Sequence, residues 1–261
     1  GGFFFTFAPN NKAIETKQNS VYGIRAIIEA IEAGQSIDKI YLQNGAEGPL
    51  MISLKKLAAQ KGISTVFVPI EKLNKLGQGN HQGAIATVAP VGFVSMEDLV
   101  DQVCAEKGTP LFLVLDQVSD VRNFGAMIRT ASCTGVDGII IQSKGAAPVN
   151  ADTVKTSAGA VYTVPIAKVD HIKDAVYYLQ SSGIQVVSAT EKATNTIYQT
   201  DLTPGIALVM GAEDTGISPA VLKITDHQAS LPILGEIASL NVSVACGVIL
   251  YEVVRQRMPK G

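Results

Sequence analysis

The chain has 261 residues, of which 47% are apolar and only 17% are charged, and its formal net charge is −2. This composition excludes a histone-like or wholly basic nucleic-acid binder and indicates a core-rich globular protein. No apolar run approaches the about 20 residues that cross a bilayer, so we expect a soluble protein with no membrane-spanning helix.

Charge and cysteine are distributed unevenly along the chain. Residues 1–90 carry nine Lys and Arg against six Asp and Glu, a balance of +3, whereas residues 91–261 have a balance of −5. Ordinary variation in surface charge explains this asymmetry as well as a difference in function between the two parts of the chain does. The three cysteines lie far apart without a Cys-x-x-Cys pair, which excludes a disulfide framework and a Cys-rich zinc site. We therefore expect no bound metal and a cytoplasmic protein.

The N-terminal part divides into an extension and a small domain. Residues 1–18 begin with a Phe-rich stretch that lacks both the basic region and the cleavage site of a signal peptide, so we expect an extension that is disordered or foreign to the native sequence. Residues 19–90 form a predicted α/β domain. It begins with an amphipathic helix from Val21, with Ser20 as its N-cap and Gly34 as its stop. Short β-rich runs and a second helix follow, at residues 39–42, 65–68, 84–89 and 50–60.

The C-terminal part is more regular. Residues 91–109 contain Pro, Gly and a polar helical segment, and we expect a linker there. Residues 110–261 form a predicted second domain in which apolar β-rich runs alternate with helical patterns. This alternation predicts an α/β fold with a mainly parallel sheet that helices cover on both faces. The β-rich runs span residues 111–115, 138–141, 162–166, 184–188, 206–210 and 229–232.

The loops after these runs are the expected place for a site, because ligands of open α/β sheets bind beyond the carboxyl ends of the strands. None of these loops contains the Gly-x-Gly-x-x-Gly fingerprint of a dinucleotide site or the Gly-Lys-Ser/Thr of a P-loop. Rossmann dehydrogenases, P-loop kinases and the common Rossmann-type methyltransferases are therefore disfavoured.

The first loop of interest follows Asp116. We expect it to end at Asn123 as the N-cap of a helix whose early turns carry Arg129. A helix start together with an arginine favours a phosphate. The alternative is that Asn123 only caps the helix and that Arg129 is a solvated surface residue.

Two further loops carry polar residues in an apolar setting. In the stretch 208–219, Glu213 lies between Gly211 and Gly216, a pattern that suits a close ligand approach but also an ordinary tight turn. In the stretch 231–245, Ser239 is a candidate cap, and Asn241 is one of two polar residues at the start of a helix that we expect to be buried. A ligand is one way to supply the partners that such polar groups need.

Together the three loops resemble the SpoU (TrmH-type) family of RNA ribose 2′-O-methyltransferases. The motifs are N-x-G-A-x-x-R-T-A from Asn123, G-x-E-x-x-G from Gly211 and P-I-x-G-x-x-x-S-L-N-V-S-V-A from Pro232. The resemblance covers residues 110–257, and residues 20–89 resemble the small RNA-substrate-binding domain of ribosomal-RNA members. The chain departs from the family at Val121, where Pro is frequent, and at Asp214, where Gly is frequent.

The resemblance implies a trefoil-knot fold and a homodimer whose partner chain completes the site. It implies S-adenosyl-L-methionine as the cofactor and RNA as the partner. The residues expected to line the cofactor pocket are Gly211, Leu231, Ile233 and Leu240, with Thr190 as a weaker candidate. The residues expected to serve substrate and catalysis are Asn123, Arg129, Glu213, Ser239 and Asn241.

The implied reaction is methyl transfer to a ribose 2′-hydroxyl in structured RNA, with a guanosine of 23S ribosomal RNA favoured. Because an arginine with a pKa above about 12 is a poor base, we expect Arg129 to anchor phosphate and to stabilise the developing alkoxide. Cys133 and Cys246 are expected to be small buried hydrophobes, which disfavours base methylation through a cysteine nucleophile. A transfer-RNA methyltransferase and a non-catalytic RNA-binding or ribosome-assembly protein are the alternatives, and the intact polar motif residues weigh against the second.

Overall fold

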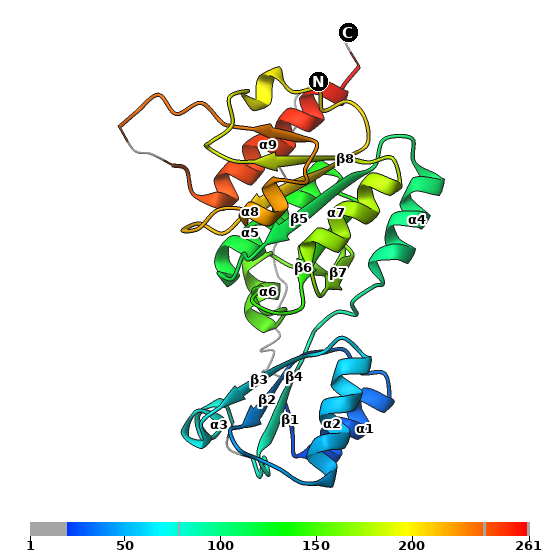
Figure 1. The fold of residues 1–261 in the computed structure, drawn as a ribbon, viewed down its shortest axis with the longest axis vertical. Helices are drawn as coiled ribbons and strands as arrows, with labels where there is room; N and C mark the ends of the chain where they lie inside the picture. The colour runs from blue at the N-terminus through cyan, green and yellow to red at the C-terminus, as the bar shows by residue number, and fades with distance from the viewer. Residues whose placement is uncertain (1–19, 78, 237–238, 260–261) are drawn as a thin grey trace, which may run out of the picture.

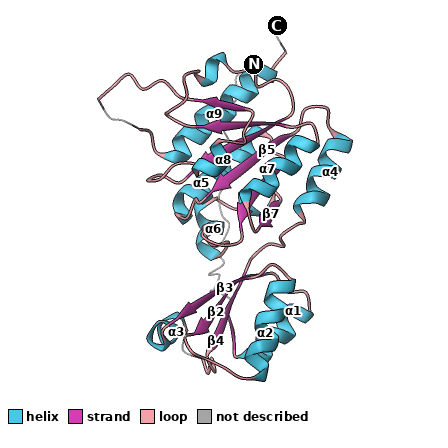
Figure 2. Ribbon diagram, in the orientation of Figure 1, coloured by secondary structure: helices cyan, strands magenta, loops and turns pink. Residues whose placement is uncertain are grey.

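The computed structural model describes residues 20–259 except residues 78 and 237–238. The extension predicted for residues 1–18 lies outside the described residues. The described chain is an α/β protein with a small N-terminal domain and a larger C-terminal domain that contains a parallel sheet, as the sequence predicted (Figures 1 and 2). No helix among the described residues combines the length and the apolar character that crossing a bilayer requires.

The N-terminal domain is built on a four-stranded mixed sheet with the order β1-β4-β2-β3. Helices α1 and α2 pack on one face of this sheet, and α3 covers part of the other face (Figure 1). The elements are β1 (Ser20–Tyr22), α1 (Ile24–Glu32), β2 (Ile37–Gln43), α2 (Pro49–Gln60), β3 (Ser64–Val68), α3 (Ile70–Leu76) and β4 (Ala84–Val88).

The predicted cap of the first helix was wrong. Ser20 lies in strand β1, where it is paired with Thr87 of β4 in antiparallel register. The helix begins only after Gly23, whose φ of 91° lets the chain turn from strand into helix. Gly34, with a φ of 80°, follows the end of the helix as predicted.

The C-terminal domain contains a six-stranded sheet with the order β10-β8-β9-β5-β6-β7, in which every pair of neighbours is parallel. All residues of the central strands β5 and β9 are buried, because helices cover both faces. The strands are β5 (Leu111–Asp116), β6 (Gly138–Gln142), β7 (Ile166–Val169), β8 (Gln185–Ala189), β9 (Ile206–Gly211) and β10 (His227–Ala229). Two predicted strands were misplaced, since the runs at residues 162–166 and 229–232 share only one residue each with β7 and β10. A 3-10 turn occupies Ala160–Tyr162 and packs Val161 against α5.

The helices of this domain form two layers. One face carries α4 (Met96–Glu106), α7 (Ile172–Ser181) and α8 (Pro219–Leu222), and the other carries α5 (Val121–Thr134), α6 (Ala151–Thr156) and α9 (Val242–Arg257). Helix α4 lies within the segment predicted as a linker. It nevertheless buries Met96, Leu99 and Val100 against the sheet of the C-terminal domain. The extended chain between the two sheets is therefore shorter than the predicted linker.

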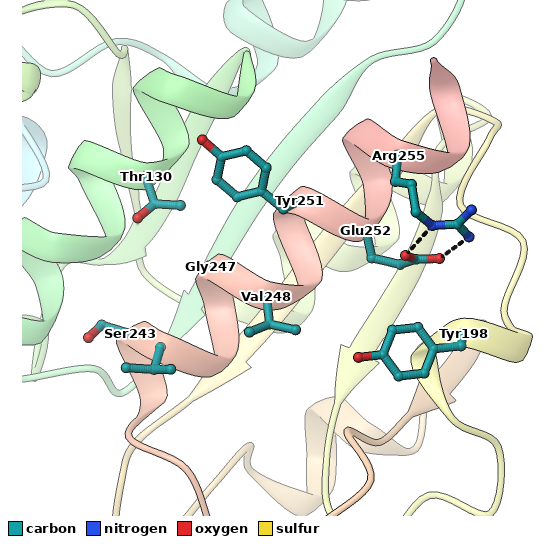
Figure 3. Close-up of a pocket in the computed structure, with 9 residues that line it drawn as sticks. Thr130, Tyr198, Ser243, Gly247, Val248, Tyr251, Glu252 and Arg255 are labelled. Atoms are coloured by element: carbon teal, nitrogen blue, oxygen red, sulfur yellow. Dashed lines mark hydrogen bonds and ion pairs between the residues drawn. The ribbon is translucent and has the colours of Figure 1, made fainter. Parts of the chain in front are cut away.

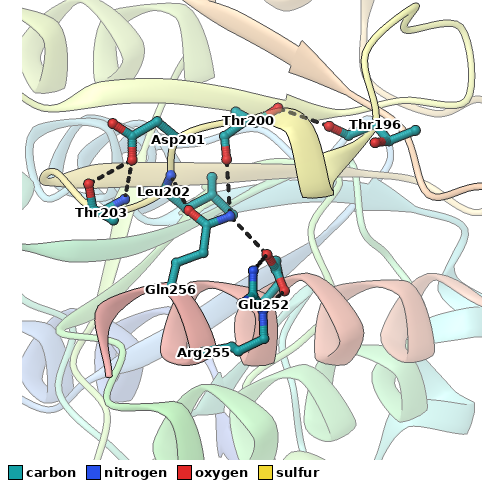
Figure 4. A network of polar contacts seen from close by, with 8 residues as sticks. All are labelled: Thr196, Thr200, Asp201, Leu202, Thr203, Glu252, Arg255 and Gln256. Carbon is teal, nitrogen blue, oxygen red and sulfur yellow. Dashed lines mark hydrogen bonds and ion pairs between the residues drawn. The ribbon is translucent and has the colours of Figure 1, made fainter. Parts of the chain in front are cut away.

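The C-terminal end of α9 is held by polar contacts to the loop that precedes β9. The Gln256 side chain accepts a hydrogen bond from the Leu202 backbone N–H (2.8 Å) and donates to the Thr200 carbonyl (3.1 Å) and to Glu252 (2.8 Å) (Figure 4). Arg257 donates further bonds to the carbonyls of Leu202 and Thr109. Because this end is fixed, the opposite end of α9 has a defined position at the carboxyl edge of the sheet.

Candidate active site

A cavity of about 400 Å³ lies at the carboxyl edge of the parallel sheet, between the loops that follow β8, β9 and β10. All five residues predicted to hold a cofactor line it, although they come from three separate loops: Thr190, Gly211, Leu231, Ile233 and Leu240. Two residues predicted to serve the substrate, Glu213 and Ser239, line the same cavity. The structure thus brings apolar side chains together with three carboxylates, those of Glu191, Glu213 and Asp214, and the ammonium group of Lys192 in one pocket. Apolar walls with a few polar groups are usual in small-molecule sites.

Gly211 allows the loop after β9 to fold back tightly on itself. A Cβ atom at this position would lie 2.2 Å from the Gly216 carbonyl carbon and 2.2 Å from the Ile217 nitrogen. The turn is closed by two backbone hydrogen bonds between Ala212 and Gly216, of 3.2 and 2.9 Å. Only a glycine fits there, because any side chain would collide with the returning backbone of the turn.

A buried carboxylate that the motif analysis did not assign holds the far side of this turn. Asp116, at the end of β5, is 1% exposed, and its Oδ2 accepts a hydrogen bond from the Ser218 N–H (2.7 Å). The sequence signal was available, because an aspartate that ends a wholly apolar strand is costly to bury without a partner. Asp116 ties the loop of Glu213 to the central strand β5.

The three predicted motif loops meet through side-chain amides. The Asn123 Nδ2 donates to Glu213 Oε2 (3.1 Å), and the Asn241 Nδ2 donates to Asn123 Oδ1 (3.0 Å). These residues are 90 and 118 positions apart in the sequence. We call Asn123, Glu213 and Asn241 the amide–carboxylate network.

The start of α9 fixes the direction of this network. The Asn241 Oδ1 caps the helix by accepting from the Ser243 N–H (3.0 Å) and the Val244 N–H (3.3 Å). Its Nδ2 must therefore point to Asn123, whose own Nδ2 then points to Glu213. The amides of Asn241 and Asn123 are therefore polarised in the same direction, from the positive N-terminal end of α9 toward the carboxylate of Glu213.

Two predicted helix caps were wrong. Helix α5 begins at Val121, and its N-cap is Asp120, whose carboxylate accepts from the Arg122 and Asn123 N–H groups at 3.0 and 2.8 Å. Helix α9 is capped by Asn241, and Ser239 lies before the cap. Asp120 therefore occupies two of the N–H groups at the start of α5, which the sequence predicted to bind a phosphate. The Asn123 side chain does not cap the helix and is free to join the network.

Arg129 lies apart from the network. It is exposed on α5, six residues beyond Asn123, which is about 9 Å further along the helix axis and on a different side of the helix. It does not line the cavity, and its side chain forms no hydrogen bond or ion pair with any other described residue. Within one chain, the structure gathers four of the five residues predicted for substrate and catalysis around the cavity and the network, and Arg129 is the exception.

The two cysteines of interest have different surroundings. Cys246 is fully buried on α9 as predicted, and burial raises the pKa of its thiol to about 12. Cys133 was predicted to be buried, but it is exposed, because α5 directs Met127, Ile128 and Ala131 to the core and turns position 133 outward. Neither thiol lines the cavity.

A second hollow, of about 680 Å³, runs along α9 beside α5 (Figure 3). Its walls include large apolar side chains that are half exposed, among them Tyr251 (55%), Val244 (51%) and Tyr198 (53%). The ion pair between Glu252 and Arg255, with an Nη2 to Oε1 distance of 2.7 Å, borders the hollow. We call this hollow the α9 groove.

Comparison with protein families gives two matches that together cover most of the chain. The model of the SpoU rRNA Methylase family matches residues 110–251, and a model described as RNA 2′-O ribose methyltransferase substrate binding matches residues 20–94.

Curated relatives match over nearly their whole length. The 23S rRNA (guanosine-2′-O-)-methyltransferase RlmB of Vibrio cholerae is 36% identical, with 91% of this chain and 97% of that protein covered. The protein of the same name from Pasteurella multocida is 38% identical, with 92% and 98% covered. A putative TrmH family tRNA/rRNA methyltransferase, YacO of Bacillus subtilis, is 33% identical, with 92% and 97% covered.

Solved structures show the same architecture. The SpoU methyltransferase AviRb from Streptomyces viridochromogenes in complex with the cofactor AdoMet has a TM-score of 0.58 at 25% identity, with 91% of this chain and 89% of that chain covered. A TrmH/SpoU tRNA modifying enzyme from A. aeolicus has a TM-score of 0.52 at 30% identity, with 62% and 84% covered.

Proposed function

The chain belongs to the SpoU rRNA methylase family, and we propose that it methylates the ribose 2′-hydroxyl of a guanosine in 23S ribosomal RNA. It is an RNA 2′-O-ribose methyltransferase that uses S-adenosylmethionine. The observation that supports the ribosomal substrate is the match over both domains to relatives named for that reaction. We propose residues 19–90 as the RNA-substrate-binding domain, residues 91–109 as the connection, whose helix α4 packs on the second domain, and residues 110–261 as the methyltransferase domain.

The cavity suits S-adenosylmethionine. Its volume of about 400 Å³ lies within the range of small-molecule sites. Leu231, Ile233 and Leu240 offer an apolar surface to a flat base, and the turn from Gly211 to Gly216 forms another wall of the cavity. When bound, the cofactor supplies an electrophilic methyl group on a sulfonium.

The residues around the cavity then have distinct tasks. A ribose hydroxyl is too weak an acid to ionise at neutral pH, so its proton must pass to an acceptor, a group of the site or a solvent water, while the site stabilises the oxygen as the bond to the methyl group forms. Glu213 belongs both to the cavity wall and to the amide–carboxylate network, so Asn123 and Asn241 hold it in place. We assign Ser239 to contact with the ribose, because it is exposed on the same wall. We assign to Arg129 the anchoring of an RNA phosphate and the stabilisation of the developing alkoxide.

We propose that two copies of the chain form a homodimer across the α9 groove. Two observations support this arrangement: the groove exposes large apolar side chains, and Arg129 lies too far along α5 to join the network of its own chain. In a symmetric dimer the same surface of each copy faces the other, so Arg129 of one copy can reach the site of its partner.

Mixing two impaired variants tests the shared site. We expect the Arg129→Ala enzyme to be inactive alone and the Asn123→Ala enzyme to keep at most about a tenth of the wild-type activity. Their mixture should reach about a quarter of the wild-type activity after exchange of subunits, since half of the dimers are mixed and each of these has one intact site. Mixtures that gain no activity while subunits exchange would contradict a shared site. Light scattering that finds a monomer would contradict the dimer itself.

We also propose the trefoil knot and the cytoplasm as the place of action. The knot is supported by the family to which the chain belongs. The cytoplasm is supported by bacterial relatives named for methylation of ribosomal RNA.

The experiment that tests the function is incubation of the enzyme with labelled S-adenosylmethionine and unmodified ribosomal RNA, followed by mapping of the product. We expect a 2′-O-methylguanosine in 23S ribosomal RNA. A methylated base, or no RNA product, would overturn the proposal. A product found only in transfer RNA would favour the transfer-RNA alternative.

A further inference from the structure

We propose that a buried contact between Asp38 and Lys168 positions the substrate-binding domain for methyl transfer. Asp38 lies in β2 of the N-terminal domain, and Lys168 lies in β7 of the C-terminal domain. The contact fixes one orientation of the two domains, so that RNA bound to the N-terminal domain has one defined position relative to the cavity. This inference rests on the proposed function, because it concerns the same RNA substrate and the same site.

Lys168 meets three groups from two segments of the chain. Its Nζ lies 2.8 Å from Asp38 Oδ1 and 3.1 Å from the Asp38 carbonyl oxygen. The same Nζ lies 3.9 Å from the centroid of the Phe93 ring, which belongs to the segment between the domains. The ammonium group is thus enclosed by two acceptors and an aromatic face, which is a favourable place for a cation.

The ion pair is buried, unlike a surface salt bridge. The Lys168 side chain is 12% exposed and the Asp38 side chain is 3% exposed. Burial lowers the pKa of Lys168, while the charge and the hydrogen bond of Asp38 oppose that shift. Because desolvation offsets much of the attraction, a buried pair adds little stability, and its main effect is to penalise every arrangement in which either charge loses its partner. Such a pair selects an orientation.

The segment between the domains is held at both ends. The Ala89 N–H donates to the Ser36 carbonyl (2.7 Å), which fixes the start of the segment, just after β4, to the N-terminal domain. The Val94 N–H donates to the Ile166 carbonyl (3.0 Å), and Val94 forms a parallel bridge with Ala167, beside Lys168. Only residues 90–93 lie between these two bonds, so the covalent connection between the domains is short.

The location of the contact suits a positioning role. All six strands run in the same direction, so the carboxyl end of β7 lies on the same edge as the cavity. Strand β7 is three strands from β9, which corresponds to about 14 Å at the usual spacing between strands. The substrate-binding domain is therefore anchored on the catalytic edge and within reach of the site, and Figure 1 shows it beyond the β6–β7 end of the sheet.

The test uses the full-length enzyme and the variants Lys168→Met, Asp38→Asn and their combination. The matched control is Lys107→Met, which removes an ion pair with Asp137 whose lysine is exposed and which lies within the C-terminal domain. Three quantities are measured: the KM for a 23S ribosomal RNA fragment against kcat, the affinity for S-adenosylmethionine by calorimetry, and the distance between spin labels placed on exposed positions of the two domains.

We expect Lys168→Met to raise the KM for RNA about tenfold and to broaden the distance distribution, with kcat at saturating RNA and the cofactor affinity within about twofold of wild type. The combined variant should be no worse than either single variant, since both remove the same contact. The control should match the wild type in all three measurements.

Other results overturn the inference. An unchanged distance distribution would show that the pair does not orient the domains, whatever happens to the KM. A broadened distribution with an unchanged KM would show that orientation does not matter for the reaction. If the wild-type enzyme methylates no ribosomal RNA, the proposed function fails, whereas the distance measurement still decides whether the pair fixes the domains.

Discussion

The two domains differ in where their polar side chains meet. In the C-terminal domain, side chains from three distant loops converge, and hydrogen bonds join residues that are 90 and 118 positions apart. In the N-terminal domain the polar contacts of the loop before β4 are local: His81 Nε2 lies 2.9 Å from Asn74 Oδ1, and the Gly83 N–H donates to His81 Nδ1 at 3.0 Å.

The difference follows from the two sheets. A parallel sheet brings the carboxyl ends of all its strands to one edge, so that distant loops form one cavity. The mixed sheet of the N-terminal domain has strands that run in both directions, so its loops are divided between two edges. The first arrangement suits a catalytic site to which several loops contribute, and the second suits an extended RNA-binding surface.

The largest effect that would sharpen this contrast is expected for Arg129→Ala. We expect methyl transfer to fall by about 10³-fold, because the site loses a cationic donor to the developing alkoxide, while the affinity for S-adenosylmethionine changes little. Methyl transfer with labelled cofactor and calorimetry measure the two quantities. Lys173→Ala, an exposed cation on α7, is the control and should behave as wild type. Loss of cofactor affinity in Arg129→Ala would sink the assignment.

The next largest effect is expected for Gly211→Ala. The new methyl group would collide with the backbone of Gly216 and Ile217, so the loop must shift and the affinity for S-adenosylmethionine should fall by about 10 to 100-fold. Calorimetry measures the change. In the control Gly108→Ala, no atom lies within 4 Å of the added carbon, and cofactor affinity should be unchanged. Equal affinities for the two variants would mean that the cofactor does not bind against this loop.

A smaller effect is expected when the amide–carboxylate network is cut. Asn123→Ala and Asn241→Ala should each lower kcat at least about tenfold, because Glu213 loses the support that orients it. The double variant should be no worse than the more severe single variant, since the amides act in series. Single-turnover rates give the comparison, and additive losses would contradict a common network.

The N-terminal domain should respond in a different quantity. Lys55, whose Nζ lies 4.9 Å from the centroid of the half-exposed Phe67 ring, is a candidate phosphate contact on this domain. We expect Lys55→Met to weaken RNA binding about threefold and to reduce the salt dependence by about one phosphate contact, with cofactor affinity unchanged. Filter binding over a salt series measures the slope. A loss of kcat without a loss of RNA affinity would break the contrast between the domains.

The smallest effect on function is expected for the cysteines. At any pH well below about 12, Cys246 stays a buried thiol, so a thiol reagent should label Cys133 in the native enzyme and Cys246 only after unfolding. Cys133→Ser should retain methyl transfer. An inactive Cys133→Ser enzyme that is still folded would point to a thiol in the reaction.

Much of the fold could be predicted from the sequence because most of its signals are local. Apolar runs located four of the six strands of the C-terminal sheet, including β5 and β9, because strands buried on both faces need continuous apolar side chains. The motifs located the loops after β5, β9 and β10. The errors occurred where two local signals competed: Asn123 and Ser239 are acceptable caps, but Asp120 and Asn241 occupy the cap positions.

What the sequence by itself determined is the class of the fold, the three motif loops and five residues that line the cavity at the carboxyl edge of the sheet. The tertiary structure decided which of these side chains touch. It directed Asn123 to Glu213 and Asn241, placed Arg129 outside that network, and paired Asp38 with Lys168 across 130 positions. The physical reason is that strand and helix patterns record burial, which is set by neighbours in the chain, whereas a hydrogen bond between distant loops depends on strand order and helix direction, which no local pattern contains.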